Sequence, residues 1–243
     1  MTPVLGVIPA RFASVRFPGK VLAPLAGKPV IQHVWERAQR SPALTRVLIA
    51  TDDARVQRAA AAFGAEAVMT RADHASGTDR IAEVATRTNE PFIVNIQSDE
   101  PFIAPEAVTA LVGRLLETGA PIATCAGPLD ADHADDPNTV KVVCNAAGDA
   151  LYFSRSRIPY PRNEPGPLRK HFGIYGFTRA ALLAVAALPP SPLELAEGLE
   201  QLRWLEGGYR IAVAFTEYCG IAIDTPADLT AAERLLAQQG APA

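Results

Sequence analysis

The stretch VLGVIPARFASVRFPGK, residues 4–20, decides the class of fold. It begins with an apolar run, Val4 to Ile8, and continues after Pro9 into a loop rich in arginine, glycine and lysine. A continuous apolar run of this length is typical of a strand that is covered on both faces of a parallel sheet. The stretch therefore predicts a buried first strand that carries a basic loop at its carboxyl end.

Strand-like runs alternate with helical periodicity over the first half of the chain. Val30, Val34 and Ala38 recur every four residues, which indicates an amphipathic helix. We expect strands at 46–50, 65–69 and 92–96, and helices at 29–40, about 54–63, 79–88 and about 105–117. This alternation predicts an α/β fold with a mostly parallel sheet and right-handed crossovers.

The pattern changes in the middle of the chain. Strand-like runs at 139–144, 150–154 and 172–177 follow one another without good helices between them. They predict an antiparallel section at about 121–178, inserted into a single domain of residues 1–243.

The last third returns to alternation after a proline-rich loop. We expect that loop at 158–168, a helix at about 193–206, a strand at 210–215 and an amphipathic helix from about Pro226. In the helix at 193–206, a stripe of Leu195, Leu199 and Leu202 would face the core. Glu200 and Gln201 lie off this stripe, which would leave them free for the surface or for a ligand.

Composition excludes several classes of protein. The net charge of −3 over 243 residues gives no basic field that would attract nucleic acid. The three cysteines, Cys125, Cys144 and Cys219, form no CxxC pair, which favours reduced thiols in the cytoplasm over disulfides or zinc. The first apolar run is too short for a signal peptide or a membrane span, so no membrane partner is expected.

The loop after the first strand has the composition of a polyphosphate site. Three cations share it with a serine and a glycine: Arg11, Arg16, Lys20, Ser14 and Gly19. Backbone N–H groups and cations of such a loop could wrap and neutralise phosphates. It is not a Walker loop, because Val21 follows the lysine, and the GxGxxG fingerprint is absent. A solvated basic loop would have the same composition.

Two carboxylates follow later strands and could hold Mg²⁺ beside those phosphates. Asp99 follows the run at 92–96, and Asp224 follows the run at 210–215. Mg²⁺ prefers one or two carboxylates together with phosphate oxygens. Helix capping is the alternative for both, and Thr225 with Pro226 gives a good helix start next to Asp224.

Other polar segments leave their roles open on spacing alone. Residues 70–80 could recognise a base or ribose, or simply cap a helix. Arg155 could bind a substrate carboxylate in bidentate fashion. His171, Gly173 and Tyr175 would share one face of a strand. For Arg155, His171 and Tyr175 the sequence alone favours ordinary surface polarity over a ligand contact.

Taken together, the motifs resemble those of the 3-deoxy-manno-octulosonate (Kdo) cytidylyltransferases. The resemblance runs from Ile8 to about Leu229, and several motifs occur in order. They are PARxxSxRxPGK at 9–20, TRADHASGTDR at 70–80, VNIQSDEP at 94–101, NTVKVV at 138–143, LYFSRSRIPYPR at 151–162, KHFGIYGF at 170–177, SPLE at 191–194, LEQLR at 199–203 and IDTPADL at 223–229.

The resemblance implies a fold and a reaction. The fold would be the Rossmann-like nucleotide-diphospho-sugar transferase fold, usually a homodimer whose interface comes largely from the middle section. The reaction would be attack of the anomeric 2-hydroxyl of Kdo on the α-phosphate of CTP, with Mg²⁺ as cofactor and pyrophosphate leaving. Its product would serve lipopolysaccharide assembly.

The resemblance also assigns roles to single residues. It implies catalytic roles for Arg11, Lys20, Asp99 and Asp224, the last two as Mg²⁺ ligands. CTP would contact Arg11, Ser14, Arg16, Lys20, Ser76, Arg80 and Ser98. The sugar acid would contact Gln97, Arg155, His171, Tyr175, Glu200 and Gln201.

Three residues depart from the family pattern. Ser98 and Ala222 stand where the family usually has glycine, and Ala75 where it often has glutamine or proline. The first two flank the expected metal ligands, where a side chain restricts the backbone. They leave two alternatives open: a related acceptor, such as 8-amino-Kdo, another ulosonic acid or a phosphonate, or a weakly active nucleotide-binding paralogue.

Overall fold

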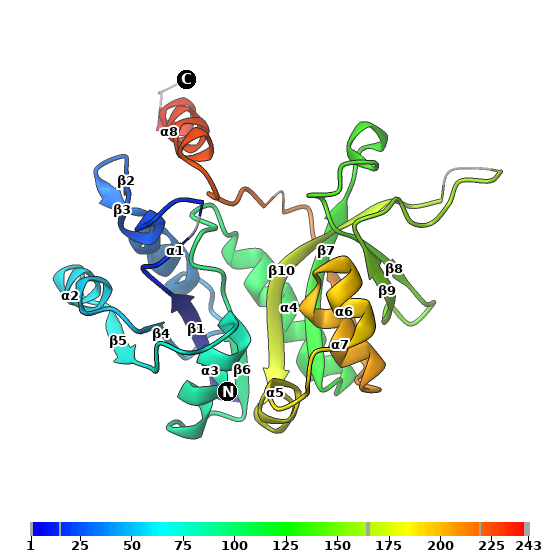
Figure 1. Cartoon of the computed structure of the whole chain (residues 1–243), viewed down its shortest axis with the longest axis horizontal. Coiled ribbons are helices and arrows are strands. Elements are labelled where there is room, and N and C mark those ends of the chain that lie inside the picture. The colour runs from blue at the N-terminus through cyan, green and yellow to red at the C-terminus, as the bar shows by residue number, and fades with distance from the viewer. Residues whose placement is uncertain (1, 15, 164–165, 219, 241–243) are drawn as a thin grey trace. The chain divides into compact units, whose positions relative to one another are not determined.

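The computed structural model describes residues 2–14, 16–163, 166–218 and 220–240. The fold is mixed α/β, with a mostly parallel sheet and a small antiparallel sheet, which confirms the predicted fold class. The chain divides into two compact units (Figure 1): the first comprises Met1–Glu90, Asn95–Pro105 and Gly220–Ala243, and the second comprises Pro91–Val94 and Glu106–Cys219. The single domain with an inserted section stays a prediction.

The first unit is built on three parallel strands in the order β1-β4-β5. These are β1 (Val4–Ala10), β4 (Arg46–Thr51) and β5 (Glu66–Met69). Every residue of β1 is buried, as its continuous apolar sequence predicts. The connecting helices are α1 (Val30–Gln39), α2 (Ala54–Ala62) and α3 (Gly77–Thr86).

Helix α3 begins two residues before the predicted start at Asp79, because a capping box fixes its first turn. The Ser76 hydroxyl accepts a hydrogen bond from the Asp79 N–H (3.1 Å), and the Asp79 carboxylate accepts one from the Ser76 N–H (3.1 Å). One of the two roles considered for residues 70–80, capping of a helix, is therefore present in the structure at Ser76.

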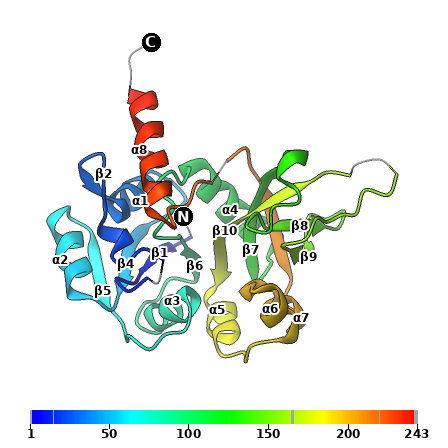
Figure 2. The same cartoon turned by 45° about the horizontal axis from the view of Figure 1, so that its top comes forward.

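The first unit is completed by the C-terminal helix α8 (Pro226–Gly240), which packs on the hairpin of β2 (Pro24–Leu25) and β3 (Lys28–Pro29). Figure 2 shows α8 beside this hairpin. Leu25 of the hairpin and Ala232 of α8 belong to one buried cluster with Val30, Phe102 and Ile223. The helix thereby holds the preceding segment, residues 220–225, within the first unit.

The second unit contains the antiparallel pairing expected for about 121–178. Strand β7 (Ile122–Pro128) lies between β10 (Arg169–Thr178), to which it is antiparallel, and β11 (Ile211–Phe215), to which it is parallel. Strands β8 (Lys141–Cys144) and β9 (Ala150–Ser154) form an antiparallel pair that extends from β10, and β6 (Phe92–Asn95) also neighbours β10.

Helices α4 (Pro105–Thr118) and α5 (Arg179–Ala186) and two single 3₁₀ turns, η1 (Lys20–Leu22) and η2 (Ala131–His133), complete the elements outside residues 192–206. The sequence did not predict β7 or α5 as separate elements. Both are rich in alanine, and neither has strong periodicity of its own.

The prediction of a single helix at 193–206 is wrong. Two helices, α6 (Pro192–Glu197) and α7 (Glu200–Glu206), occupy this range, because Gly198 adopts a left-handed conformation (φ 63°) that ends α6. The break rotates the second helix relative to the expected stripe. Leu195 is 73% exposed and so does not belong to the core stripe, whereas Leu199 and Leu202 are buried as expected. Gln201 is 4% exposed, which contradicts a place on the surface and leaves its predicted role toward a ligand open.

Cys125 and Cys144 are free thiols, as expected, and Cys219 lies outside the described residues. Within the described ranges, no helix has the length and apolar character needed to cross a bilayer.

Candidate active site

The loop after β1 closes on itself through Gly19. The Gly19 N–H donates to the Phe12 carbonyl (2.9 Å), and Gly19 adopts φ 72°, where a side chain would be strained and would also meet the Phe12 ring. The Arg55 guanidinium of α2 lies over the Phe12 ring, 3.4 Å from the ring centre. The loop is therefore tied to α2 at one end while Lys20 opens the turn η1 at the other.

Lys20 joins the two carboxylates that the sequence assigns to the metal. Its Nζ donates to Asp99 Oδ2 (2.6 Å) and to Asp224 Oδ1 (3.0 Å), and Arg16 Nη2 also lies 2.9 Å from Asp224 Oδ1. Burial alone would lower the pKa of Lys20, but the charges and hydrogen bonds of the two carboxylates raise it above its ordinary value. The ammonium is charged, and the two aspartates converge on one cationic centre.

The convergence depends on a backbone link between two loops that are far apart in sequence. The Ile223 N–H donates to the Asp99 carbonyl (2.8 Å), so Asp224 is placed directly beside the loop that follows residue 95. This bond fixes the spacing of the two carboxylates through the main chain, independently of Lys20.

Neither aspartate caps a helix, which removes the alternative that the sequence left open. Helix α4 begins at Pro105, six positions after Asp99. At α8, Asp228 Oδ2 accepts from the Thr225 N–H (2.8 Å) and the Asp224 N–H (3.0 Å), while the Thr225 hydroxyl accepts from the Asp228 N–H (3.3 Å). Thr225 is thus the N-cap, as predicted, and the Asp224 side chain faces the cations.

The residues assigned to CTP gather around one cavity of about 330 Å³ in the first unit. Its lining includes all ten of the candidate residues that lie in this unit: Arg11, Ser14, Arg16, Lys20, Ser76, Arg80, Gln97, Ser98, Asp99 and Asp224. Pro9, Val21, His74, Ala75 and Gly77 also line it. Four basic side chains in one cavity give it the charge that a polyphosphate requires.

Two carboxylates on this cavity suit Mg²⁺ rather than a metal held entirely by protein. In the described part of the chain, no group of three or more His, Cys, Asp or Glu side chains is arranged to hold a metal ion. Mg²⁺ commonly takes one or two carboxylates and completes its shell with phosphate oxygens and water. The convergence of Asp99 and Asp224 on one ammonium shows that a cation fits between them.

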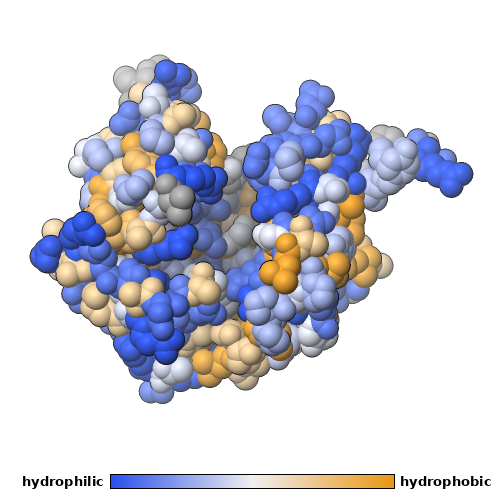
Figure 3. All heavy atoms as spheres, in the orientation of Figure 1, coloured by the Kyte–Doolittle hydropathy of each residue, from blue (hydrophilic) through white to orange (hydrophobic). Residues whose placement is uncertain are grey.

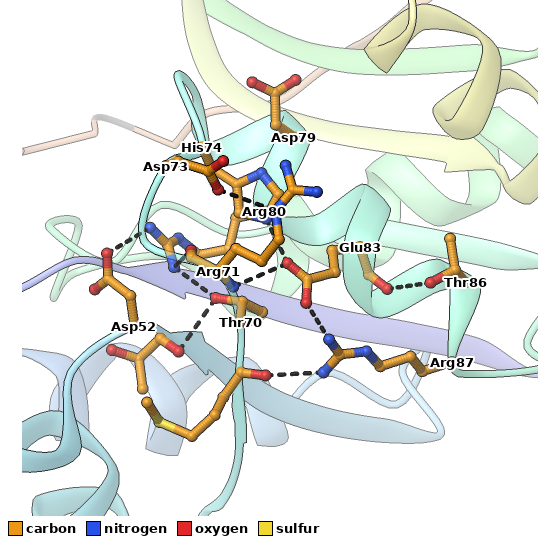
Figure 4. Close-up of polar contacts among 12 residues, drawn as sticks. Asp52, Thr70, Arg71, Asp73, His74, Asp79, Arg80, Glu83, Thr86 and Arg87 are labelled. Carbon is orange, nitrogen blue, oxygen red and sulfur yellow. Dashed lines mark hydrogen bonds and ion pairs between the residues drawn. The ribbon is translucent and has the colours of Figure 1, made fainter.

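Arg80 lies on the cavity wall but is largely committed to the protein (Figure 4). Its Nη1 donates to the Thr70 hydroxyl (2.5 Å) and the Arg71 carbonyl (3.2 Å), and its Nη2 pairs with Asp52 Oδ2 (3.0 Å). The side chain is 4% exposed. Arg80 therefore supports the wall at residues 70–71, and sequence reasoning missed Asp52, its partner from the end of β4.

We expect Asp52→Asn to lower the free energy of unfolding by about 2 kcal/mol, because it leaves the buried Arg80 guanidinium without a countercharge. Urea denaturation of wild type and variant measures the difference. Asp73→Asn is the matched control: Asp73 pairs with Arg71, but both side chains are largely exposed, and we expect a change below about 0.5 kcal/mol. Equal effects of the two changes would contradict the role given to Asp52.

The two departures next to the expected metal ligands do not strain the backbone. Among the described residues, Ala26 is the non-glycine residue with positive φ, so Ser98 and Ala222 both adopt conformations open to any side chain. Ser98 lines the cavity and Ala222 is exposed. Neither position requires the glycine of the family pattern for conformational reasons.

The residues assigned to the sugar acid, apart from Gln97, lie in the second unit. Arg155 donates to three backbone carbonyls: Nε to Glu197 (2.7 Å), Nη1 to Pro137 (2.9 Å) and Nη2 to Gly198 (3.4 Å). The Glu197 carboxylate in turn accepts from the Arg155 N–H (2.9 Å) and the Ser154 hydroxyl (2.6 Å). The guanidinium is held rigidly, with one further N–H on each terminal nitrogen for a ligand.

His171 and Tyr175 share one face of β10, as predicted, with ring centres 5.5 Å apart. Burial lowers the pKa of His171 to about 3, and burial together with the nearby Glu200 charge raises the pKa of Tyr175 well above its ordinary value. Both side chains are therefore neutral near pH 7. The Gln201 Nε2 is buried without a hydrogen-bond partner among the described residues, which is unusual for a side-chain amide.

The chain matches the family described as cytidylyltransferase over residues 5–211. It is 53% identical over 236 residues to the 3-deoxy-manno-octulosonate cytidylyltransferase of Solibacter usitatus, which covers 96% of this chain and 94% of that protein. The protein of the same name from Escherichia coli is 47% identical, with 98% of each chain covered.

Among solved structures, the chain is similar to CMP:2-keto-3-deoxy-manno-octonic acid synthetase complexed with CTP, with a TM-score of 0.94 and 45% identity over 98% of this chain and 99% of that chain. A cytidylyltransferase from Leptospira borgpetersenii has a TM-score of 0.67 at 16% identity, over 98% of this chain and 88% of that chain, which shows likeness of fold alone.

Proposed function

Because the chain belongs to the cytidylyltransferase family, we propose that it transfers CMP from CTP to the anomeric 2-hydroxyl of Kdo and releases pyrophosphate. The observation that carries this proposal is the single cavity on which the basic loop and both aspartates meet. Relatives of about 50% identity over nearly their whole length bear the name of this activity.

The basic loop would bind the triphosphate of CTP. Arg11, Arg16 and Lys20 would offset its negative charge, and the Ser14 hydroxyl would donate or accept a hydrogen bond at its edge. The backbone hydrogen bond from Gly19 to Phe12 closes the loop that carries these side chains. In-line attack on the α-phosphate needs such positioning and charge compensation, and no covalent intermediate with the protein.

We propose that Asp99 and Asp224 hold Mg²⁺ when CTP is bound. When bound there, Mg²⁺ supplies positive charge to the phosphates and lowers the pKa of an attacking hydroxyl. Lys20 occupies the space between the two carboxylates in this structure, so its ammonium would move toward the phosphates as the metal enters. In its new place, the positive charge of the Lys20 ammonium would be balanced by the negative charge of the triphosphate.

The second unit offers groups that suit a polyhydroxylated acid. Arg155 suits the carboxylate, and the buried Gln201 amide suits a hydroxyl or ring oxygen. His171, Tyr175, Glu200 and, from the first unit, Gln97 complete the set of side chains that we assign to the acceptor. All six match the family motifs without change, which supports Kdo as the acceptor.

The test is pyrophosphate release from CTP with Mg²⁺ and a panel of acceptors: Kdo, 8-amino-Kdo, another ulosonic acid and a phosphonate. We expect the highest kcat/KM with Kdo. A higher kcat/KM with another member of the panel would show that this compound, and not Kdo, is the preferred acceptor. Absence of turnover with every compound would overturn the proposed function.

We also propose that the chain forms a homodimer, acts in the cytoplasm and serves lipopolysaccharide assembly. Exposed leucines of the second unit support self-association: Leu151 on β9 is 60% exposed and Leu195 on α6 is 73% exposed. Hydrophobic spheres lie on the surface over α6 and over β8 and β9 in Figure 3. Light scattering after size exclusion measures the mass, and a monomer at micromolar concentration would contradict the dimer.

A further inference from the structure

Thr124 is a buried polar residue of β7 to which the reaction has so far assigned no role. It is 0% exposed and lies opposite Tyr175 in the pairing of β7 with β10, where the register shifts between Phe172 and Tyr175. Its Oγ1 lies 2.9 Å from His171 Nε2, 2.8 Å from the Ile174 carbonyl oxygen and 3.2 Å from the Phe172 carbonyl oxygen.

Counting protons fixes the direction of these hydrogen bonds. Thr124 Oγ1 carries one proton, and carbonyl oxygens only accept. If that proton pointed to His171, Oγ1 would face two carbonyl oxygens in a buried place with no proton between them, which is costly. The hydroxyl therefore donates to a carbonyl, the nearer being that of Ile174, and accepts from His171. His171 Nε2 must carry the proton.

The other ring nitrogen of His171 is then an acceptor. The ring is neutral because burial lowers its pKa to about 3, so a proton on Nε2 leaves Nδ1 with a free lone pair. The described part of the chain contains a hydrogen bond of this ring at Nε2 and none at Nδ1. The ring itself is packed between Phe153 (ring centres 4.8 Å apart) and Tyr175 (5.5 Å), which prevents it from turning freely.

We propose that Thr124 is a positioning residue that fixes His171 as the Nε2–H tautomer, so that Nδ1 accepts a hydrogen bond from a hydroxyl of the sugar acid. The proposal rests on the proposed function, because it takes His171 as a contact of the acceptor. It adds a requirement: the acceptor must present an O–H donor to this nitrogen, and an analogue without that donor would lose this hydrogen bond.

The first experiment needs no variant. Long-range ¹H–¹⁵N correlation spectra of wild-type protein with ¹⁵N-labelled histidine distinguish protonated from unprotonated ring nitrogens and report the tautomer of each histidine. We expect the His171 signal to show a protonated Nε2 and an unprotonated Nδ1 at neutral pH. A protonated Nδ1 would overturn the proposal, whatever the chain's activity.

The second experiment removes only the hydroxyl. Thr124→Val keeps the shape of the side chain but offers no acceptor to His171, and we expect its His171 signal to lose the fixed Nε2–H pattern. We expect KM for Kdo to rise roughly 10-fold while KM for CTP stays within about 2-fold, because one hydrogen bond to the acceptor is lost. Thr124→Ser restores a hydroxyl and is expected to regain the tautomer and most of the acceptor affinity.

The outcomes separate this proposal from the proposed function. An unchanged KM for Kdo in a folded Thr124→Val protein, or a failure of Thr124→Ser to restore it, would overturn the role of Thr124. Absence of turnover with Kdo in the wild type would overturn the proposed function, and the tautomer measurement would still decide whether Thr124 fixes His171. If Thr124→Val does not fold, the wild-type spectrum and Thr124→Ser still decide between the alternatives.

Discussion

Asp99→Asn and Asp224→Asn are each expected to reduce the rate of pyrophosphate release roughly 100- to 1000-fold or more, while the protein still folds. Each substitution keeps the shape of the side chain but removes one of the two negative charges that converge on Lys20. In our proposal those charges hold Mg²⁺ against the phosphates, so their loss weakens an interaction that matters most in the transition state.

Steady-state rates at saturating CTP and Kdo measure the effect, and thermal melting checks the fold. Asp53→Asn is a suitable control, because Asp53 belongs to the same unit but caps α2 and does not line the cavity. We expect its rate to remain within about 3-fold of wild type. Near-normal, Mg²⁺-dependent turnover by either Asp99→Asn or Asp224→Asn would contradict the metal assignment.

Acid is expected to destabilise the protein in part through His171. Burial lowers the pKa of this histidine to about 3 in the folded chain, against an ordinary value of 6.5. As the pH falls below 6.5 the unfolded chain binds a proton at this position and the folded chain does not, so the free energy of unfolding falls until about pH 3. Between pH 7 and pH 4 the loss from this residue alone is about 3 kcal/mol.

Urea denaturation of wild type and His171→Gln at several pH values isolates the contribution, because glutamine has no titrating group. We expect the stability advantage of wild type over the variant to shrink as the pH falls from 7 to 4. His133→Gln is the control for the chemical change itself, since His133 is exposed in the turn η2. A His171→Gln difference that does not change between pH 7 and pH 4 would contradict the lowered pKa of His171 in the folded chain.

The fold was largely predictable because two strands of the first unit, β1 and β4, are buried on both faces. Runs such as Val4–Ile8 contain no polar side chain that would suit a solvent-exposed face, and the helices between them keep a clear period. The wrong prediction at 193–206 came where one residue overrides a pattern. Gly198 ends α6 in a left-handed conformation, which moved Gln201 into the core and Leu195 to the surface.

The candidate site was predictable only in part, because some of its residues act through partners that are far away in the sequence. Arg11, Lys20 and Asp99 follow strands, and the ends of parallel strands lie together, so a cavity containing them could be expected. Asp228 could have been found from its capping-box spacing after Thr225. Nothing in the sequence marks Thr124 or Asp52, because their roles depend on partners 47 and 28 positions away.

The bond between Ile223 and Asp99 also has a consequence for how the chain is made. Asp224 is the last of the cavity residues to leave the ribosome, after the whole of Glu106–Cys219 has been synthesised. A nascent chain that stops within that segment already contains the basic loop and Asp99, yet it lacks the second carboxylate. The second unit must therefore be synthesised before the first unit contains both carboxylates, Asp99 and Asp224. Chains that end prematurely within the second unit would lack one of the two proposed metal ligands.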